Sequence, residues 1–184
     1  MPKMGVTPQA ALPLHIGTLT SLFSAGFDAC QATTTFNINT FNWPAQNRGL
    51  YVPVSIPFAY PVRRIWWVNG SVATGNQDFA IYNEEFVRFF RTEPKAQSGN
   101  SLPQYIDVTD FWLPAGRWYF FLSNDSATTT TRAFGNTEVK TQEGRMGGLV
   151  QQASVANAPE KGTPEAWASE GLPNFGITRT ASGF

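Results

Sequence analysis

Side chains able to do nucleophilic or acid–base chemistry are scarce in this chain. It contains one histidine, His15, and one cysteine, Cys30. A Ser-His-Asp triad would have to recruit His15 from a proline-punctuated stretch, and no G-x-S-x-G nucleophile motif is present. A metal site built from His and Cys ligands alone needs three or four of them, and this chain has two. A single cysteine cannot form an intramolecular disulfide. We therefore expect no enzyme, no cofactor and no metal ion.

Carboxylates offer two further chemistries. Asp107 with Asp110, or Asp125 with Asn124, would supply the oxygen ligands that calcium prefers. A glycosidase would need two carboxylates facing each other across a cleft. The candidates for such a pair are Asp78, Glu84, Glu85, Glu93, Asp107 and Asp110. Sequence spacing places no two of them across a groove, and Asp and Asn commonly bond their own backbone in turns, so a turn role is the favoured interpretation.

Aromatic side chains suggest a third chemistry, the stacking of a sugar ring on Trp or Tyr. The candidates are Trp43, Trp66, Trp67, Trp112 and Trp118, with Tyr82 close in sequence to Asp78. Aromatic residues also dominate protein cores and interfaces. For each of these side chains, a place in the core or in an interface is the favoured interpretation.

Composition narrows the choice of partners. Aromatic residues make up 14% of the chain, equal to the charged fraction, and 13 basic residues balance 13 acidic ones. Zero net charge argues against nucleic-acid binding and against attraction to anionic membranes. Prolines interrupt the N-terminal stretch, so no signal peptide is expected, and no run is long enough for a membrane helix. We expect synthesis in a cytoplasm.

Three zones differ in composition. Residues 1–31 are small and nearly uncharged, residues 32–136 hold most of the aromatics, and residues 137–184 are rich in Gly, Ala, Pro, Gln and Glu. Eight stretches of the middle zone have strand character and end at turn residues: 33–42, 50–58, 62–69, 79–83, 86–91, 104–108, 117–123 and 128–134. The pattern predicts an all-β fold, an antiparallel β-sandwich and specifically a jelly roll of about eight strands, with extended arms at both ends.

The stretch 50–58 shows the clearest strand periodicity. Leu50, Val52, Val54, Ile56 and Phe58 alternate with other residues and share one face. Prolines at 53 and 57 occupy the opposite phase. Because proline donates no ladder hydrogen bond, this strand is predicted to be an edge strand or a bulged one.

Several strands are apolar on both faces. Residues 65–68 read Ile-Trp-Trp-Val, residues 89–90 are two phenylalanines, and residues 118–122 read Trp-Tyr-Phe-Phe-Leu. A free-standing antiparallel sheet normally keeps one face wet, so the pattern predicts that a partner covers the second face. The candidate interface residues are Trp66, Trp67, Phe89, Phe90, Tyr119 and Phe121.

The C-terminal zone is predicted to be an arm that becomes ordered when isolated large side chains dock on a neighbouring subunit. Its candidate anchors are Trp167, Phe175 and Phe184, and intrinsic disorder is the alternative. Within it, residues 163–168 predict one short helix, with Thr163 as the N-cap and Pro164 at the first helical position.

The run YVPVSIPFAYPVRRIWWVNGSVATGNQDFAIYN (residues 51–83), the QSGNS linker and the later DVTDFWLPAGRWYFFLSND (residues 107–125) carry a family resemblance. They resemble a recurrent domain in virion structural proteins of tailed bacteriophages. The likeness spans residues 50–125 and rests on short motifs. It implies a jelly-roll or carbohydrate-binding-module-like sandwich in tail fibres, baseplates or head decorations.

We therefore expect a non-enzymatic structural component of a tailed-phage virion, either a capsid decoration (cement) protein or a tail or fibre-attachment protein. Its expected partners are copies of itself and other virion proteins, and its place is the virion, assembled in the host cytoplasm. The alternative is a tail module that binds a host-surface glycan or receptor.

Overall fold

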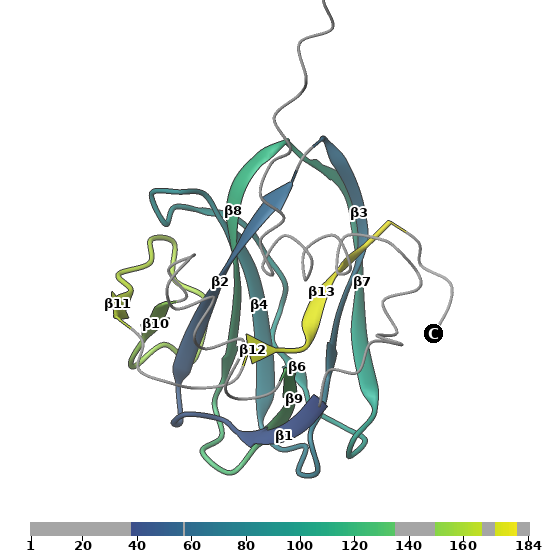
Figure 1. The fold of residues 1–184 in the computed structure, drawn as a ribbon, viewed down its shortest axis with the longest axis vertical. Coiled ribbons are helices and arrows are strands. Elements are labelled where there is room, and N and C mark those ends of the chain that lie inside the picture. The colour runs from purple at the N-terminus through teal and green to yellow at the C-terminus, as the bar shows by residue number, and fades with distance from the viewer. Residues whose placement is uncertain (1–37, 57, 135–149, 167–171, 180–184) are drawn as a thin grey trace, which may run out of the picture.

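The computed structural model describes residues 38–56, 58–134, 150–166 and 172–179. These residues form thirteen strands and no helix (Figure 1). The strands are β1 (Ile38–Asn42), β2 (Arg48–Ile56), β3 (Tyr60–Val68), β4 (Asn76–Tyr82), β5 (Arg88–Arg91), β6 (Lys95–Ala96), β7 (Pro103–Leu113), β8 (Gly116–Asn124), β9 (Thr130–Phe134), β10 (Val150–Gln152), β11 (Glu165–Ala166), β12 (Leu172–Pro173) and β13 (Phe175–Thr178). The predicted all-β class is confirmed.

Two antiparallel sheets face each other, an arrangement consistent with a β-sandwich. The large sheet has the order β11-β10-β2-β8-β4-β5, with β6 paired to β4, and the β3 sheet has the order β13-β3-β7. Figure 1 shows β2, β8 and β4 on one side of the molecule and β3 with β7 on the other. A third sheet, β1-β9-β12, lies at one end.

The core between the two sheets is apolar and aromatic. The large sheet contributes Leu50, Val52, Val54, Ile56, Phe79, Ile81, Trp118, Phe120 and Leu122, and the β3 sheet contributes Tyr60, Val62, Ile65, Trp67, Leu113, Phe175 and Ile177. The alternation predicted for β2 is therefore found as far as Ile56, where every second residue enters this core.

The one proline of β2, Pro53, is accommodated at a partly open edge, and Pro57 lies outside the described residues. β10 pairs with β2 only at Gly49, Leu50 and Tyr51. Pro53 lies beyond that contact, and its registered partner on the other side is Tyr119 of β8. Among the described residues, the second half of β2 is thus an edge, where the missing N–H costs no ladder hydrogen bond.

Residues from the predicted C-terminal arm enter the sheets of their own subunit. Leu172 and Pro173 pair with β9, and residues 175–178 pair with β3. Between them, the Asn174 N–H donates to the Arg132 carbonyl at 2.8 Å, and the Asn174 carbonyl accepts from Val68 N–H at 3.0 Å. Strands β12 and β13 therefore connect β9 to β3.

The helix predicted over residues 163–168 is wrong. Residues Glu165 and Ala166 form β11, which pairs with β10 through Gln151 and Val150. Residues 167 and 168 lie outside the described residues. The Thr-Pro-Glu signal for a helix start is a weak local preference, and backbone pairing with a strand distant in sequence outweighs it.

Buried amides link the two sheets at the end of the sandwich opposite the β7–β8 turn. Gln97 Nε2 donates to Asn69 Oδ1 at 3.0 Å and to Gln77 Oε1 at 3.1 Å. Asn124 Nδ2 donates to the same Gln77 oxygen at 3.2 Å, and Trp67 Nε1 donates to Asn69 Oδ1 at 2.9 Å. Because buried amides destabilise a fold unless they are hydrogen-bonded, this network favours one registration of the sheets.

Candidate functional site

The carboxylates that suggested calcium binding are engaged with other side chains. Asp107 Oδ1 accepts from Arg64 Nε at 2.6 Å, and Asp110 Oδ2 lies 2.8 Å from Arg63 Nε. Asp125 accepts from the backbone and side-chain nitrogens of Asn76, both at 2.7 Å. Within the described ranges, no three His, Cys, Asp or Glu residues gather where they could hold a metal ion.

Two more expectations from the sequence concern the single histidine and cysteine and the lack of a membrane helix. His15 and Cys30 fall outside the described residues. In the described portion, no helix is long and apolar enough to cross a membrane.

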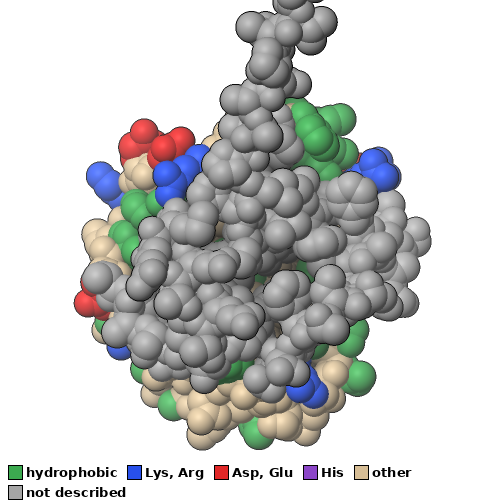
Figure 2. Space-filling model, viewed as in Figure 1, with side chains coloured by type: hydrophobic (Ala, Val, Ile, Leu, Met, Phe, Trp, Pro, Cys, Tyr) green, Lys and Arg blue, Asp and Glu red, His purple; other side chains and the backbone are tan. Residues whose placement is uncertain are grey.

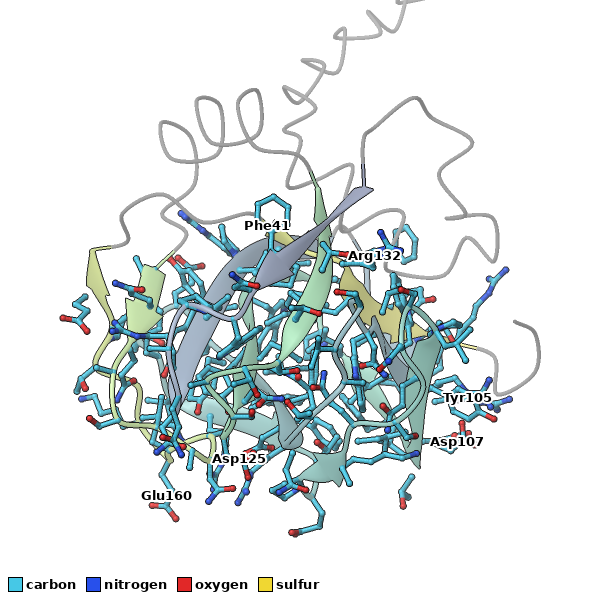
Figure 3. The ribbon with its side chains drawn as sticks, turned by 90° about the horizontal axis from the view of Figure 1, so that it is seen from below. Phe41, Tyr105, Asp107, Asp125, Arg132 and Glu160 are labelled. Atoms are coloured by element: carbon cyan, nitrogen blue, oxygen red, sulfur yellow. The ribbon has the colours of Figure 1, made fainter. Side chains whose placement is uncertain are left out.

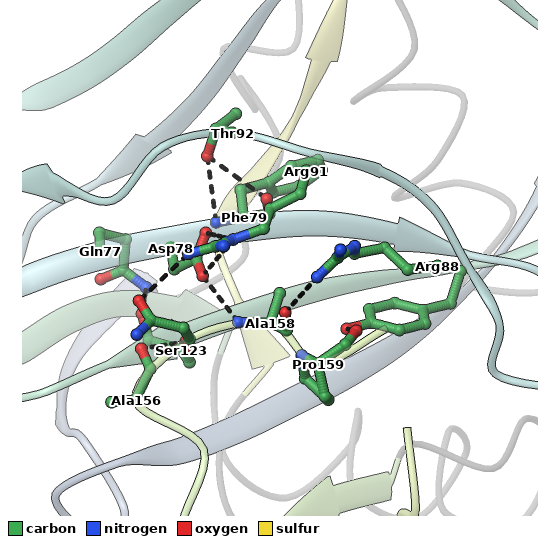
Figure 4. Close-up of polar contacts among 12 residues, drawn as sticks. Gln77, Asp78, Phe79, Arg88, Arg91, Thr92, Ser123, Ala156, Ala158 and Pro159 are labelled. Atoms are coloured by element: carbon green, nitrogen blue, oxygen red, sulfur yellow. Dashed lines mark hydrogen bonds and ion pairs between the residues drawn. The ribbon is translucent and has the colours of Figure 1, made fainter. Parts of the chain in front are cut away.

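Asp78 is the most deeply buried carboxylate of the described residues, on the face of β4 that points away from the core (Figure 4). Its Oδ2 accepts from the Ala158 N–H at 2.7 Å and from Arg91 Nε at 3.0 Å. Arg91 also donates to Asn157 Oδ1 at 3.1 Å. Burial raises the pKa of Asp78, and the Ala158 N–H and the Arg91 charge partly offset that shift.

Asp78 holds a segment that we name the strap, residues 150–162. The Tyr82 hydroxyl donates to the Pro159 carbonyl at 2.6 Å, and Arg88 Nη1 donates to the Ala158 carbonyl at 2.6 Å. The Tyr51 hydroxyl donates to Gln152 Oε1 at 2.7 Å. Burial raises the pKa of both tyrosines, so they remain neutral hydrogen-bond donors.

The strap covers the second face of the large sheet. Val155 and Ala158 pack on a cluster made of Tyr51, Ala80, Tyr82, Tyr119 and Phe121, all of them buried. The chain itself therefore shields the face for which the sequence pattern predicted a partner. At this face the physical argument for a partner no longer applies, because the apolar surface is already removed from water.

The structure separates the candidate interface residues into groups. Tyr119 and Phe121 lie under the strap. Trp67 and Phe175 lie in the core, and Trp66 is buried as well. Trp167 and Phe184 fall outside the described residues.

Phe89 and Phe90, the remaining candidates, lie near the surface. Phe90 is partly buried and stacks on Phe111 with a centroid separation of 4.4 Å. Phe89 is 47% exposed and packs against Trp118 at 5.0 Å. At the same end of the sandwich, Phe58 is 63% exposed in the β2–β3 link and Val87 is 45% exposed beside β5.

We name Phe58, Val87 and Phe89 the apolar end. Phe58 precedes Tyr60, which pairs with Leu113 at the end of β7. Val87 and Phe89 flank Arg88, which pairs with Tyr82, and Tyr82 pairs in turn with Tyr119 near the start of β8. All three members therefore lie near the β7–β8 turn. Figure 2 shows hydrophobic side chains exposed at this upper end of the molecule. Exposed apolar groups that gather in one place often mark an interaction site.

The outer face of the β3 sheet carries a second surface feature. The Arg64 guanidinium lies 3.8 Å from the centroid of the Tyr105 ring and bonds Asp107. Lys95 Nζ donates to the Tyr105 carbonyl at 2.6 Å. Figure 3 shows Tyr105 and Asp107 side by side and directed away from the core. The hydrogen bond from Arg64 holds the pKa of Asp107 below its ordinary value.

Sequence reasoning about sugar platforms named five tryptophans and Tyr82, and missed Tyr105. Tyr82 is buried under the strap. Trp43 and Trp118 are buried, and their indole nitrogens donate to the carbonyls of Arg48 and Pro114. Trp112, which was named, is 65% exposed. The signal for Tyr105 was the alternation of polar and apolar residues along β7. Its neighbour Ile106 faces the core, so Tyr105 lies on the other face of the strand.

Comparisons with known proteins found no match to a family model, to a curated protein or to a solved structure.

Proposed function

We propose that this chain is a non-enzymatic structural component of a tailed-phage virion, either a capsid decoration protein or a tail or fibre-attachment protein. The sequence resemblance over residues 50–125 motivates this role. An antiparallel all-β fold with an aromatic core is compatible with it. The proposed partners are further copies of the chain and other virion proteins, and the proposed location is the virion assembled in the host cytoplasm.

The finer fold that we propose is a jelly roll. We count the eight strands from β1 to β9 in order, leaving out the two-residue β6. In a jelly roll the second strand lies beside the seventh, the seventh beside the fourth and the fourth beside the fifth. The order β2-β8-β4-β5 agrees with that rule. The pairs β1-β9 and β3-β7, with the bridge between Asn69 and Thr131, agree with the order of the second jelly-roll sheet.

The apolar end is the observation that carries the structural role. Strap and core cover the two buried aromatic clusters, whereas Phe58, Val87 and Phe89, like Tyr105 and Trp112 of β7, remain exposed on the isolated subunit. Interfaces are enriched in aromatic side chains, and a few buried anchors supply most of their binding energy. Burial of these residues against a second copy of the chain is therefore the proposed mode of assembly.

Sedimentation velocity of the full chain at micromolar concentration tests this proposal. We expect an oligomer for the wild type and a monomer for the double variant Phe58→Ser, Phe89→Ser. Leu102→Ser is the matched control. Leu102 is 57% exposed and precedes Pro103, the first residue of β7, so it lies at the end of the sandwich opposite the apolar end. A monomeric wild type, or an oligomer unaffected by the double variant, would contradict this mode of assembly.

The virion assignment needs its own measurement. Mass spectrometry of purified phage particles that encode this chain should detect it at a fixed copy number relative to the other virion proteins. Its absence from such particles would overturn the assignment.

A further inference from the structure

Four side chains on β7 point to solvent from the outer face of the β3 sheet. We name Tyr105, Asp107, Asp110 and Trp112 the β7 row. The other face of the same strand carries Ile106, Val108, Phe111 and Leu113, which pack on the core. Val62 pairs with Phe111 and Arg64 with Asp107, so β7 has two more residues than β3 at this irregularity. Thr109 and Asp110 are both exposed there, and Tyr105 and Trp112 therefore share the outer face although seven positions separate them.

We propose that the β7 row binds a neutral saccharide chain. Tyr105 and Trp112 would each stack on the apolar face of a pyranose ring, and Asp107 and Asp110 would accept hydrogen bonds from sugar hydroxyls. This inference does not depend on the proposed virion role, because it uses none of the residues of the apolar end.

The Tyr105 ring is fixed in a position suited to stacking. One face lies on the Arg64 guanidinium, whose side chain is only 8% exposed. Tyr105 itself is 41% exposed, so its solvent-facing area comes from the opposite face and the rim. Because β3 and β7 hold the ring from below, a ligand would not have to order it, and such preorganisation favours binding.

The polar groups of the row are likewise held before any ligand arrives. Asp107 is 55% exposed while Oδ1 bonds Arg64 at 2.6 Å, and Asp110 is 60% exposed beside Arg63 at 2.8 Å. Carboxylates placed in this way can accept from hydroxyl donors. The arrangement combines flat aromatic faces with fixed acceptors, which matches a ring that has one apolar face and a polar rim.

Spacing and charge indicate the class of ligand. Trp112 lies seven positions after Tyr105, a length of at most about 23 Å at a strand rise of about 3.3 Å per residue. That length suits a chain of several sugar rings rather than a single ring. Arg63 and Arg64 are paired with Asp110 and Asp107, and Lys95 adds a single positive charge near Tyr105. The surface therefore carries far less positive charge than phosphate or nucleic-acid binding requires.

An array of neutral oligosaccharides built from glucose, galactose, mannose, rhamnose and N-acetylglucosamine tests the inference, followed by calorimetric titration with the best binder. Tyr105→Ala and Trp112→Ala should each weaken binding by about tenfold, the loss expected for one aromatic stacking contact. Tyr105→Phe keeps the ring and should bind like the wild type. Asp107→Asn should weaken binding to a smaller degree, and Leu102→Ala, a control outside the row, should not change it.

The inference is overturned if no neutral oligosaccharide binds the wild type at about 1 mM, or if the Tyr105→Ala, Trp112→Ala double variant binds as well as the wild type. Thermal unfolding of each variant checks that the fold is intact, and Trp112→Ala is the safer variant because Trp112 is largely exposed. Repeating the titration with the Phe58→Ser, Phe89→Ser variant separates an absence of sugar affinity from coverage by self-association.

Discussion

Asp78 illustrates how one buried side chain can help to hold a segment that is distant in sequence. Its carboxylate lies on β4, and the N–H group that it binds belongs to Ala158 in the strap. A buried carboxylate is unfavourable unless charged or hydrogen-bonding partners compensate, and here Arg91 and the strap backbone do so. The strap is thus held by a polar contact as well as by apolar packing.

Replacement of Asp78 by alanine should destabilise the fold by about 2–4 kcal/mol, because it leaves the Ala158 N–H and Arg91 without their acceptor. Urea unfolding measures the loss, and hydrogen exchange at Ala158 should accelerate more than exchange in β8. Asp125→Ala is the control, since Asp125 also accepts two hydrogen bonds but lies nearer the surface. An equal loss for both variants would argue against a special role for Asp78.

Asp78 and Asp107 should give opposite dependences of stability on pH. The folded-state pKa of Asp78 is raised, so its contribution is present below the unfolded pKa of about 3.9 and is lost as pH rises through the folded value. The folded-state pKa of Asp107 is lowered, so its contribution is present above about 3.9 and is lost as pH falls through the folded value.

The measurement is urea unfolding of wild type, Asp78→Asn and Asp107→Asn over a pH series. Relative to wild type, Asp78→Asn should gain stability as pH rises, whereas Asp107→Asn should lose stability as pH rises. Slopes of the same sign for the two variants would contradict the assigned environments.

At the scale of elements, the C-terminal part of the chain completes the sheets. Strands β12 and β13 bond β9 on one side and β3 on the other. Phe175 and Ile177 add two buried side chains to the core, and the strap covers four aromatic rings of the large sheet. These segments are thus integral parts of the sandwich rather than attachments to it.

A chain truncated after Phe134 should therefore not fold into a stable sandwich. It would expose the face that carries Tyr51, Tyr82 and Phe121 and would leave β3 without β13. We expect loss of the cooperative thermal transition, together with binding of a dye that reports exposed apolar surface. A truncated chain that unfolds cooperatively near the wild-type midpoint would show that these elements contribute little.

At the scale of the whole molecule, we expect contact between exposed apolar side chains to drive self-association. The net charge is zero, and the strap already covers the second face of the large sheet. The chain carries no net charge, so electrostatic attraction between copies should be weak. The apolar end offers side chains whose burial is favourable at any salt concentration.

Sedimentation at about 1 M NaCl should therefore show the same oligomer as at about 0.1 M, because salt screens charges over about 3 Å and 10 Å respectively but does not weaken apolar burial. The Leu102→Ser control should behave like the wild type at both salt concentrations. Dissociation at high salt would indicate an interface of ion pairs and would exclude the apolar end as its main component.

Much of the strand pattern could be predicted from local sequence. The alternation of Leu50, Val52, Val54 and Ile56 identified β2 and its core face, because the two-residue period of a strand is a local property. The all-β class followed from many such stretches separated by turn residues. Tyr105 could have been found in the same way, from its place opposite Ile106.

Other features depended on contacts between residues far apart in sequence. The sequence by itself determined that Trp118 to Leu122 would be apolar on both faces of a strand, and hence that something must cover the second face. Only the tertiary structure decided that residues 150–162 of the same chain cover it, and that residues 165 and 166 are a strand rather than a helix. The physical reason is that apolar burial is non-directional, so a pattern reports the need for cover but not its source, whereas the hydrogen bonds from Ala158 to Asp78 and from Tyr82 to Pro159 identify the segment that supplies it.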